Sequence, residues 1–139
     1  MILEEIELNL KAILEDLPRA IESIDNFLRR KGIEKETILK LQLAMDEAIT
    51  NIIEYGCQDK AGVIKIVCNL SAKEITLIIE DNAKPFNPLT VKEPELSSDV
   101  EKRKIGGLGV FIMKKMMDEV SYEFRNGKNI LTLKKKIPE

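Results

Sequence analysis

The chain has 139 residues, of which 44% are hydrophobic and 33% are charged, and its formal net charge is −2. This length and composition indicate one globular domain with its own core, and the charge gives no reason to expect a nucleic-acid partner. The chain contains no histidine, which excludes a Ser-His-Asp triad, a Cys-His pair, histidine-bound metal and phosphohistidine chemistry. Catalysis would have to use carboxylates, amides, backbone N–H groups and a cation, and phosphoryl transfer needs little more.

The composition also bears on the cellular compartment. No apolar run approaches the roughly 20 residues that span a bilayer, and acidic residues precede the first basic one. Cys57 and Cys68 are too few and too irregularly placed for a disulfide framework or a zinc site. We therefore expect a cytoplasmic protein with reduced thiols and no membrane association.

The first half of the chain predicts one strand and two helices. Residues 5–14 alternate between apolar and polar, which is the period of a half-buried strand. Asp16 is a candidate N-cap and Pro18 a candidate first-turn residue for a helix that ends at Gly32. Apolar residues at spacings of three and four then predict a second helix over 34–56.

The middle of the chain predicts two strands and then two irregular segments. Residues 63–70 and 74–80 are rich in β-formers and are separated by a short turn. Residues 81–88 contain two prolines, which neither a helix interior nor a strand interior accepts. Residues 89–104 are polar, and a loop of this length in a small domain predicts a mobile lid over a site.

The end of the chain predicts a third helix and two strands. The helix follows the glycine-rich segment 106–109, and the strands cover 119–125 and 128–137 around the hairpin signal Asn126-Gly127. The element order β-α-α-β-β-lid-α-β-β predicts a single α+β domain over 1–139. We expect a two-layer sandwich with three helices packed on one face of a mixed, mostly antiparallel sheet.

Glu47 and Asn51 are the first candidate site residues. They lie one turn apart on the second helix, beside its apolar stripe, where a carboxylate and a carboxamide are costly to desolvate without partners. A hydrated Mg²⁺ carrying a nucleotide would suit both, with the Asn51 oxygen as a ligand and Glu47 as a base. Alternatively, both are solvated side chains of an ordinary amphipathic helix.

Two later segments could complete such a site. Asp81 ends a buried strand, where its carboxylate could accept a hydrogen bond from an amino group such as adenine N6, or could simply shape a β-turn. Gly106, Gly107 and Gly109 could let backbone N–H groups at a helix N-terminus close on phosphate oxygens, or could form a flexible entry to the helix. Lys104 could neutralise phosphate charge or be solvated.

In series, these segments resemble the motifs of the gyrase/Hsp90/histidine-kinase/MutL ATP-binding superfamily. Glu47-Ala-Ile-Thr-Asn51 resembles its N box, Asp81-Asn-Ala-Lys-Pro-Phe86 its first glycine box, and Gly106-Gly-Leu-Gly-Val-Phe-Ile-Met113 its second. The short single-domain form, with Met117-Asp-Glu-Val-Ser-Tyr122 and Asn129-Ile-Leu-Thr-Leu133 near its end, is similar to the anti-sigma factor serine kinases of bacterial partner-switching systems.

The resemblance implies a Bergerat-type fold that binds ATP and Mg²⁺. It implies that Asn51 binds Mg²⁺, that Asp81 binds the adenine amino group, and that Glu47 activates a serine on an anti-sigma factor antagonist protein. It also implies that the chain, often as a homodimer, binds a sigma factor when the antagonist is phosphorylated. The further nucleotide-binding residues implied are Ala83, Pro85, Phe86, Lys104, Gly106, Gly107, Leu108 and Gly109.

Ala83 departs from the pattern because the family expects glycine at this position, and a methyl group there is tolerated only where φ is negative. This departure favours an alternative, a nucleotide-responsive binding module that sequesters a partner without transferring phosphate. A detached ATP-binding domain of a histidine kinase and a nucleotide-independent structural domain are two further alternatives. The first would need a phosphoacceptor on another protein, because the chain has no histidine.

Overall fold

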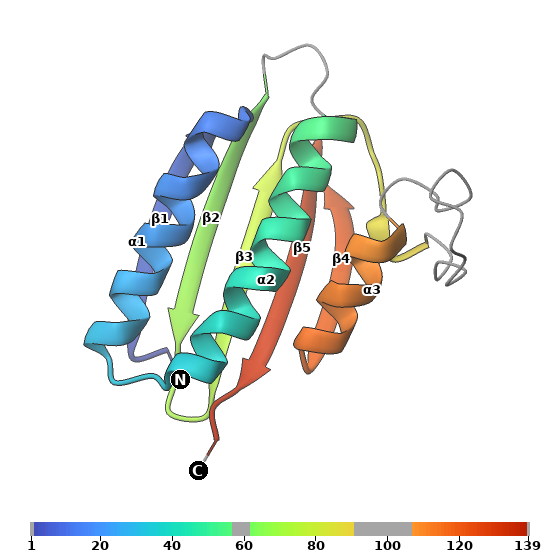
Figure 1. The fold of residues 1–139 in the computed structure, drawn as a ribbon. Helices are drawn as coiled ribbons and strands as arrows, with labels where there is room; N and C mark the ends of the chain where they lie inside the picture. The colour runs from blue at the N-terminus through green and yellow to red at the C-terminus, as the bar shows by residue number, and fades with distance from the viewer. Residues whose placement is uncertain (1, 57–61, 91–106, 139) are drawn as a thin grey trace.

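A computed structural model describes residues 2–56, 62–90 and 107–138, arranged as helices in front of a sheet (Figure 1). The elements in chain order are β1 (Glu4–Lys11), a 3₁₀ turn (Leu14–Asp16), α1 (Leu17–Arg30), α2 (Lys35–Asn51), a π-helical turn (Ile52–Gly56), β2 (Val63–Leu70), β3 (Glu74–Asp81), a 3₁₀ turn (Pro88–Thr90), α3 (Gly107–Met116), β4 (Glu119–Arg125) and β5 (Lys128–Lys136). This order confirms the predicted sequence of helices and strands.

The five described strands form one sheet in the order β1-β2-β3-β5-β4, and α1, α2 and α3 all cover the same face (Figure 1). The prediction of a two-layer α+β sandwich is confirmed. Every described pairing is antiparallel, so the sheet is not mixed as expected. The chain leaves β3 through α3 and returns in β4, which runs parallel to β3, but β5 lies between them and pairs antiparallel with both.

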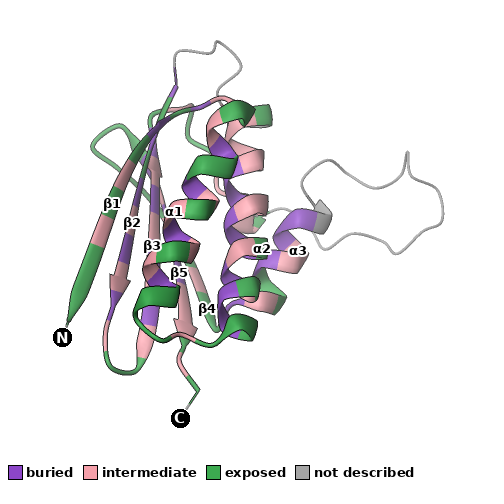
Figure 2. Cartoon of the chain, turned by 60° about the vertical axis from the view of Figure 1, so that its left-hand side comes forward, coloured by how far each residue is buried: buried purple, intermediate pink, exposed green. Residues whose placement is uncertain are grey.

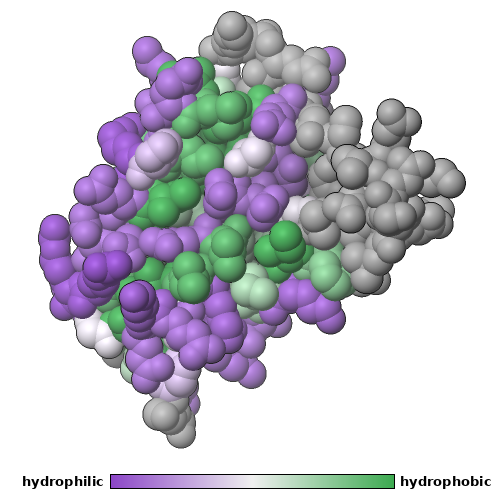
Figure 3. Space-filling model, in the orientation of Figure 1, coloured by the Kyte–Doolittle hydropathy of each residue, from purple (hydrophilic) through white to green (hydrophobic). Residues whose placement is uncertain are grey.

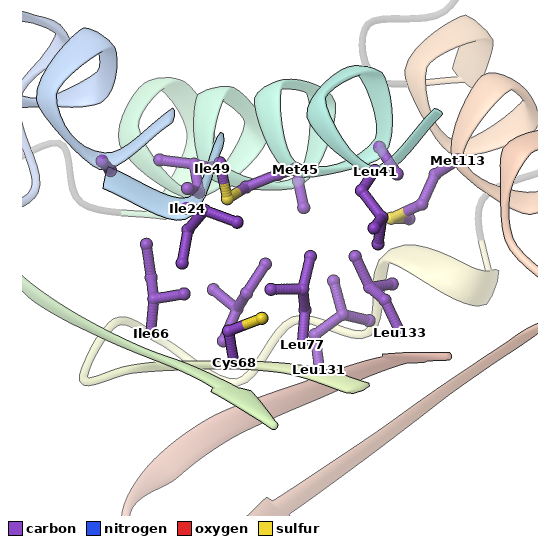
Figure 4. Packing of buried hydrophobic residues seen from close by; sticks show 14 of the residues in the cluster. Ile24, Leu41, Met45, Ile49, Ile66, Cys68, Leu77, Met113, Leu131 and Leu133 are labelled. Carbon is purple, nitrogen blue, oxygen red and sulfur yellow. The ribbon is translucent and has the colours of Figure 1, made fainter. Parts of the chain in front are cut away.

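The core lies between the helical layer and the sheet. In each central strand alternate residues are buried, and the buried sides of the helices face the sheet (Figure 2). Side chains such as Met45 and Ile49 of α2 point toward Cys68 of β2, Leu77 of β3 and Leu133 of β5 (Figure 4). Each large apolar side chain buried here contributes about 1.5–3 kcal/mol relative to exposure.

The ends of two helices differ in detail from the prediction. Asp16 occupies the N-cap position of α1, but its carboxylate accepts the backbone N–H of Lys11 at 3.0 Å and makes no capping bond. The second helix is α-helical only to Asn51, and residues 52–56 continue as a π-helical turn, a feature often found at functional sites. Within the described ranges, no helix is both long and apolar enough to cross a membrane.

The strand β5 pairs with β4 through a tight hairpin and with β3 along its other edge, and the site depends on this second pairing. Asn126 and Gly127 have φ values of 54° and 77°, as the two central residues of a tight hairpin turn require. The pairing of β3 with β5 then places Asn129 directly opposite Asp81, at the end of β3. Two polar residues 48 positions apart in the chain thus become neighbours at one edge of the core.

Candidate nucleotide-binding site

A pocket opens where the end of β3 meets the C-terminal part of α2. The residues that line it are Ala48, Asn51, Ile52, Gly56, Asp81, Ala83, Lys84, Phe86, Pro88, Met113, Tyr122, Asn129 and Leu131. Most of this wall is apolar, and a few polar groups converge on it.

Asp81 is the buried carboxylate of the pocket and is 5% exposed. Its Oδ1 accepts hydrogen bonds from the Ala83 N–H and from Asn129 Nδ2, both at 2.9 Å. Burial raises the pKa of Asp81, and these two bonds partly offset the rise. Among the described residues, no donor forms a hydrogen bond with Oδ2.

Asn129 fixes the loop after Asp81. Its Nδ2 also donates to the carbonyl oxygens of Lys84 at 3.0 Å and Ala83 at 3.3 Å, and its Oδ1 accepts the Phe86 N–H at 3.0 Å. The Tyr122 hydroxyl donates to the same Oδ1. One buried amide thus holds the loop against β5.

Asn129 was missed as a site residue by the sequence analysis. Its residue type alone does not mark it, because an asparagine after Asn126-Gly127 resembles part of the turn. The strand alternation carried a signal: counted back from the buried Leu133 and Leu131, Asn129 falls on the buried face. A buried carboxamide requires partners.

Glu47, Asn51 and the first turn of α3 come together beside the pocket. An added Cβ at Gly109 would lie 2.4 Å from Glu47 Oε2 and 3.7 Å from Asn51 Nδ2. The Glu47 carboxylate therefore occupies space that a side chain at position 109 would need, whereas Asn51 lies at ordinary van der Waals distance from that space. The predicted spacing of Glu47 and Asn51 along one helix face is confirmed, and the face is turned toward α3.

The surroundings of Glu47 change its acidity. Burial raises the pKa of the Glu47 carboxyl, and the neighbouring carboxylates of Asp46 and Glu54 raise it further. A carboxylate with a raised pKa is a stronger proton acceptor, which suits a general base. Neither Asp46 nor Glu54 was singled out from the sequence.

Ala83 fits its position without backbone strain. Asn126 is the only described non-glycine residue with a positive φ, so Ala83 has an ordinary backbone conformation. Its methyl group points at Gly56, where an added Cβ would lie 3.2 Å away. Gly56 leaves the space that the methyl group fills, so the alanine is accommodated.

The remaining predicted site residues divide into three groups. Phe86 lines the pocket with 46% of its surface exposed, whereas Pro85 is exposed and is not part of the lining. Gly107 and Leu108 form the start of α3. Lys104, Gly106 and all of the predicted lid except Leu89 and Thr90 lie outside the described residues.

Comparison with known protein families matches residues 10–135 to the family described as the histidine kinase-like ATPase domain. The matched segment takes up most of the chain, and the pocket, Asp81 and the glycine-led α3 lie within it. The chain therefore belongs to the histidine kinase-like ATPase domain family. The resemblance drawn from the three motifs is confirmed.

Curated relatives cover most of the chain. The serine-protein kinase RsbW of Listeria innocua is 28% identical over 136 residues, which cover 94% of this chain and 87% of that protein. RsbW of Bacillus mycoides is 25% identical and covers 94% of this chain and 84% of its own length. The anti-sigma F factor of Clostridium kluyveri is 27% identical over 122 residues, covering 83% of this chain and 81% of that protein.

Solved structures share the fold. The structure of the RsbU and RsbW domains of a Mycobacterium tuberculosis protein superposes with a TM-score of 0.71 and 14% identity, covering 96% of this chain and 32% of that chain. The catalytic domain of histidine kinase ThkA, in a nucleotide-free form, gives a TM-score of 0.57 with 16% identity, covering 99% of this chain and 100% of that chain. Both confirm the three-helix, antiparallel-sheet architecture.

Proposed function

We propose that this chain is an ATP-dependent protein serine kinase and anti-sigma factor of a bacterial partner-switching system. The observation that carries the proposal is the meeting of Glu47, Asn51 and Gly109 beside the Asp81 pocket. ATP binding alone needs no base, yet a carboxylate with a raised pKa lies at the phosphate end of the proposed site. The similarity to serine-protein kinases and to an anti-sigma factor supports the same assignment.

We assign the roles as follows. Oδ2 of Asp81 accepts a hydrogen bond from the adenine amino group, and Asn51 contributes an oxygen ligand to Mg²⁺. Backbone N–H groups at the α3 N-terminus, around Gly107 and Gly109, bind phosphate oxygens with the help of the helix dipole. The residues present fit such a ligand because the pocket is apolar where a base would lie, and the close approach of α3 leaves its N-terminus beside Asn51.

Bound Mg-ATP would supply the transferred phosphoryl group, and Mg²⁺ would neutralise charge on the phosphates. Glu47 accepts the proton of the substrate serine as the hydroxyl oxygen bonds to the γ-phosphorus and ADP leaves. This carboxylate lies against Gly109 of α3. The products are a phosphoserine on the partner, ADP and a protonated Glu47.

The wider proposal concerns partners and the lid. The acceptor serine belongs to an anti-sigma factor antagonist, and the sequestered partner is a sigma factor. The chain acts as a cytoplasmic homodimer. Light scattering would measure the mass of this dimer. Residues 89–104 close over Mg-ATP as a lid, and Lys104 within it and Gly106 after it contact the nucleotide. Limited proteolysis tests the lid, since equal cleavage of 89–104 with and without Mg-ATP would contradict it.

The first test is calorimetric titration with ATP, with and without Mg²⁺, on the wild type and Asn51→Ala. We expect micromolar binding that depends on Mg²⁺ and is lost in the variant, within the range of typical enzyme–substrate affinities. Absence of binding to the wild type would overturn the assignment of the site.

The second test separates the kinase from the binding module. Glu47→Gln keeps the size and hydrogen-bonding capacity of the side chain but removes the base. We expect it to bind Mg-ATP like the wild type and to transfer phosphate to a purified antagonist about 10²–10⁴-fold more slowly. If the wild type binds ATP and its partner but transfers no phosphate, the binding-module alternative is correct.

A further inference from the structure

The outer surface of α2 is unusual among the described helices because it exposes leucines. Leu39 is 52% exposed and Leu43 is 42% exposed, and they lie one turn apart. The most exposed positions of α1, in contrast, are polar or charged apart from Pro18, and include Glu22, Asn26 and Arg29. Neighbouring exposed apolar side chains mark an interaction surface more often than isolated ones.

The exposed apolar surface of α2 continues onto α3. In Figure 1, α3 runs antiparallel to α2, and Gly109 of α3 lies against Glu47 of α2. The turn of α3 that follows Gly109 therefore lies beside the turn of α2 that precedes Glu47. Ile112 and Met116 lie on the side of α3 that carries Gly109, and both are partly exposed. We call Leu39, Leu43, Ile112 and Met116 the apolar seam. Figure 3 shows hydrophobic side chains over this middle part of the helical layer, bordered by hydrophilic ones.

The position of the seam relative to Glu47 indicates what covers it. Leu43 lies one helical turn, about 6 Å, from Glu47, and Leu39 lies about 12 Å away. A serine that reaches Glu47 therefore brings the surface around it onto the seam. A seam of this length is longer than one residue, so side chains that neighbour the acceptor serine in the partner would also contact it.

The charges beside the seam restrict the occupant further. Asp46 and Glu54 lie close enough to Glu47 to raise the pKa of its carboxyl. A partner surface with basic groups next to its acceptor serine would complement these acids, and an acidic one would be repelled.

We propose that the apolar seam is the docking surface for the protein substrate, which presents an acceptor serine flanked by apolar side chains and at least one basic residue. This inference rests on the proposed kinase function. According to this inference, the apolar seam determines affinity for the partner, and Glu47 carries out the chemistry. Substitutions can therefore disrupt partner binding and phosphate transfer separately.

The experiment compares Leu39→Glu and Leu43→Glu with the wild type, using a purified anti-sigma factor antagonist as the probe. Glutamate is a good helix former, so the helix should be preserved. The matched control is Val63→Glu, which adds the same charge at a residue that is 52% exposed on the face of the sheet away from the helices. Calorimetry with Mg-ATP confirms that the nucleotide site is intact in each variant.

We expect both leucine variants to bind the antagonist roughly tenfold or more weakly, with KM for it raised to a similar extent and kcat unchanged. Val63→Glu should match the wild type. Equal antagonist affinity in all four proteins would overturn the inference. It would also be overturned if the leucine variants lost only sigma-factor binding, or if they converted a dimer to a monomer with antagonist affinity unchanged.

The two proposals fail in different ways. If the wild type binds the antagonist but transfers no phosphate, the kinase function is wrong, while the effect of the leucine variants on binding still decides the role of the seam. If phosphate transfer is normal but the leucine variants keep wild-type KM, the kinase function stands and the seam is not the docking surface.

Discussion

At the scale of single residues, the contact between Gly109 and Glu47 connects the fold to the proposed chemistry. Gly109 has no side chain, and the Glu47 carboxylate occupies the space that a Cβ would need. The Gly109→Ala substitution would therefore displace the carboxylate, because the end of a flexible side chain yields more readily than the helix backbone. A shift of about 1 Å at a reacting group costs on the order of 10²-fold in rate.

We predict that Gly109→Ala slows phosphate transfer about 10²-fold while the free energy of unfolding changes by less than about 1 kcal/mol. Alanine is the better helix former, which offsets the local crowding. Steady-state kinetics and urea unfolding measure the two quantities. The control is the double variant with Glu47→Gln, which should be no slower than Glu47→Gln alone. Additive losses would show that Gly109 does not act through Glu47.

The carboxylates around Glu47 lead to a pH prediction. Burial raises the pKa of Glu47, and Asp46 and Glu54 raise it further. The base works only when deprotonated, so the rate should fall as the pH falls through this raised pKa. We expect Asp46→Asn and Glu54→Gln to lower the pKa of Glu47 and move the acidic limb of the kcat–pH profile to lower pH. An acidic limb that stays in place in both variants would contradict this assignment.

At the scale of secondary-structure elements, Asn129 couples β5 to the loop after β3. It makes hydrogen bonds to Asp81, Ala83, Lys84 and Phe86 from one buried side chain. We predict that Asn129→Ala lowers the free energy of unfolding by about 2–3 kcal/mol, because several buried groups lose their partner. It should also weaken ATP binding, since the loop and Asp81 form part of the pocket wall.

The matched control is Tyr122→Phe, which removes only the hydroxyl that donates to the same Asn129 oxygen. It should cost about 1 kcal/mol and change ATP affinity little. Urea unfolding and calorimetry on both variants test the comparison. If Asn129→Ala is no less stable than Tyr122→Phe, the amide does not fix the loop.

The elements themselves were predictable because their signals are local. Alternation revealed the strands, the spacing of apolar residues revealed the helices, and Asn126-Gly127 fixed the last hairpin. The role of Asn129 was not predictable in this way, because it depends on the register between β3 and β5. The order of strands in the sheet also depends on long-range pairing. The sequence therefore did not reveal that all the described pairings are antiparallel, and a mixed sheet was expected.

The site was predictable in part for the same reason. Glu47 and Asn51 share one helix, so their proximity follows from helix geometry alone. The fit of Ala83 against Gly56 and the approach of Gly109 to Glu47 depend on contacts between separate elements. No local pattern encodes such contacts, although the glycines at both positions marked where close approaches occur.

At the scale of the whole molecule, the two layers separate stability from the proposed function. The sheet and the buried sides of the helices supply the core, whereas the proposed site residues gather at the end of β3 and the facing ends of α2 and α3 (Figure 1). A ligand in the pocket would contact α2, β3, α3 and β5 at once. Binding should therefore stabilise the domain as a unit.

Cys68 provides a probe of this coupling. It lies in β2 at the centre of the core with none of its surface exposed, and burial raises the pKa of its thiol to about 12. The thiolate fraction at pH 8 is then on the order of 10⁻⁴, so reaction with a thiol reagent requires the core to open. Cys57 lies outside the described residues, and a Cys57→Ser background leaves one thiol to follow.

We predict that Cys68 in this background is labelled only at the rate of global unfolding, and that labelling accelerates with urea in parallel with the loss of circular dichroism. Mg-ATP should slow labelling by a factor of 1 + [ATP]/Kd, because it binds the folded state alone. Asn51→Ala should be labelled at the unliganded rate at every ATP concentration. Fast labelling of the folded protein without urea would show that β2 opens locally, and the domain would then not respond to the nucleotide as one unit.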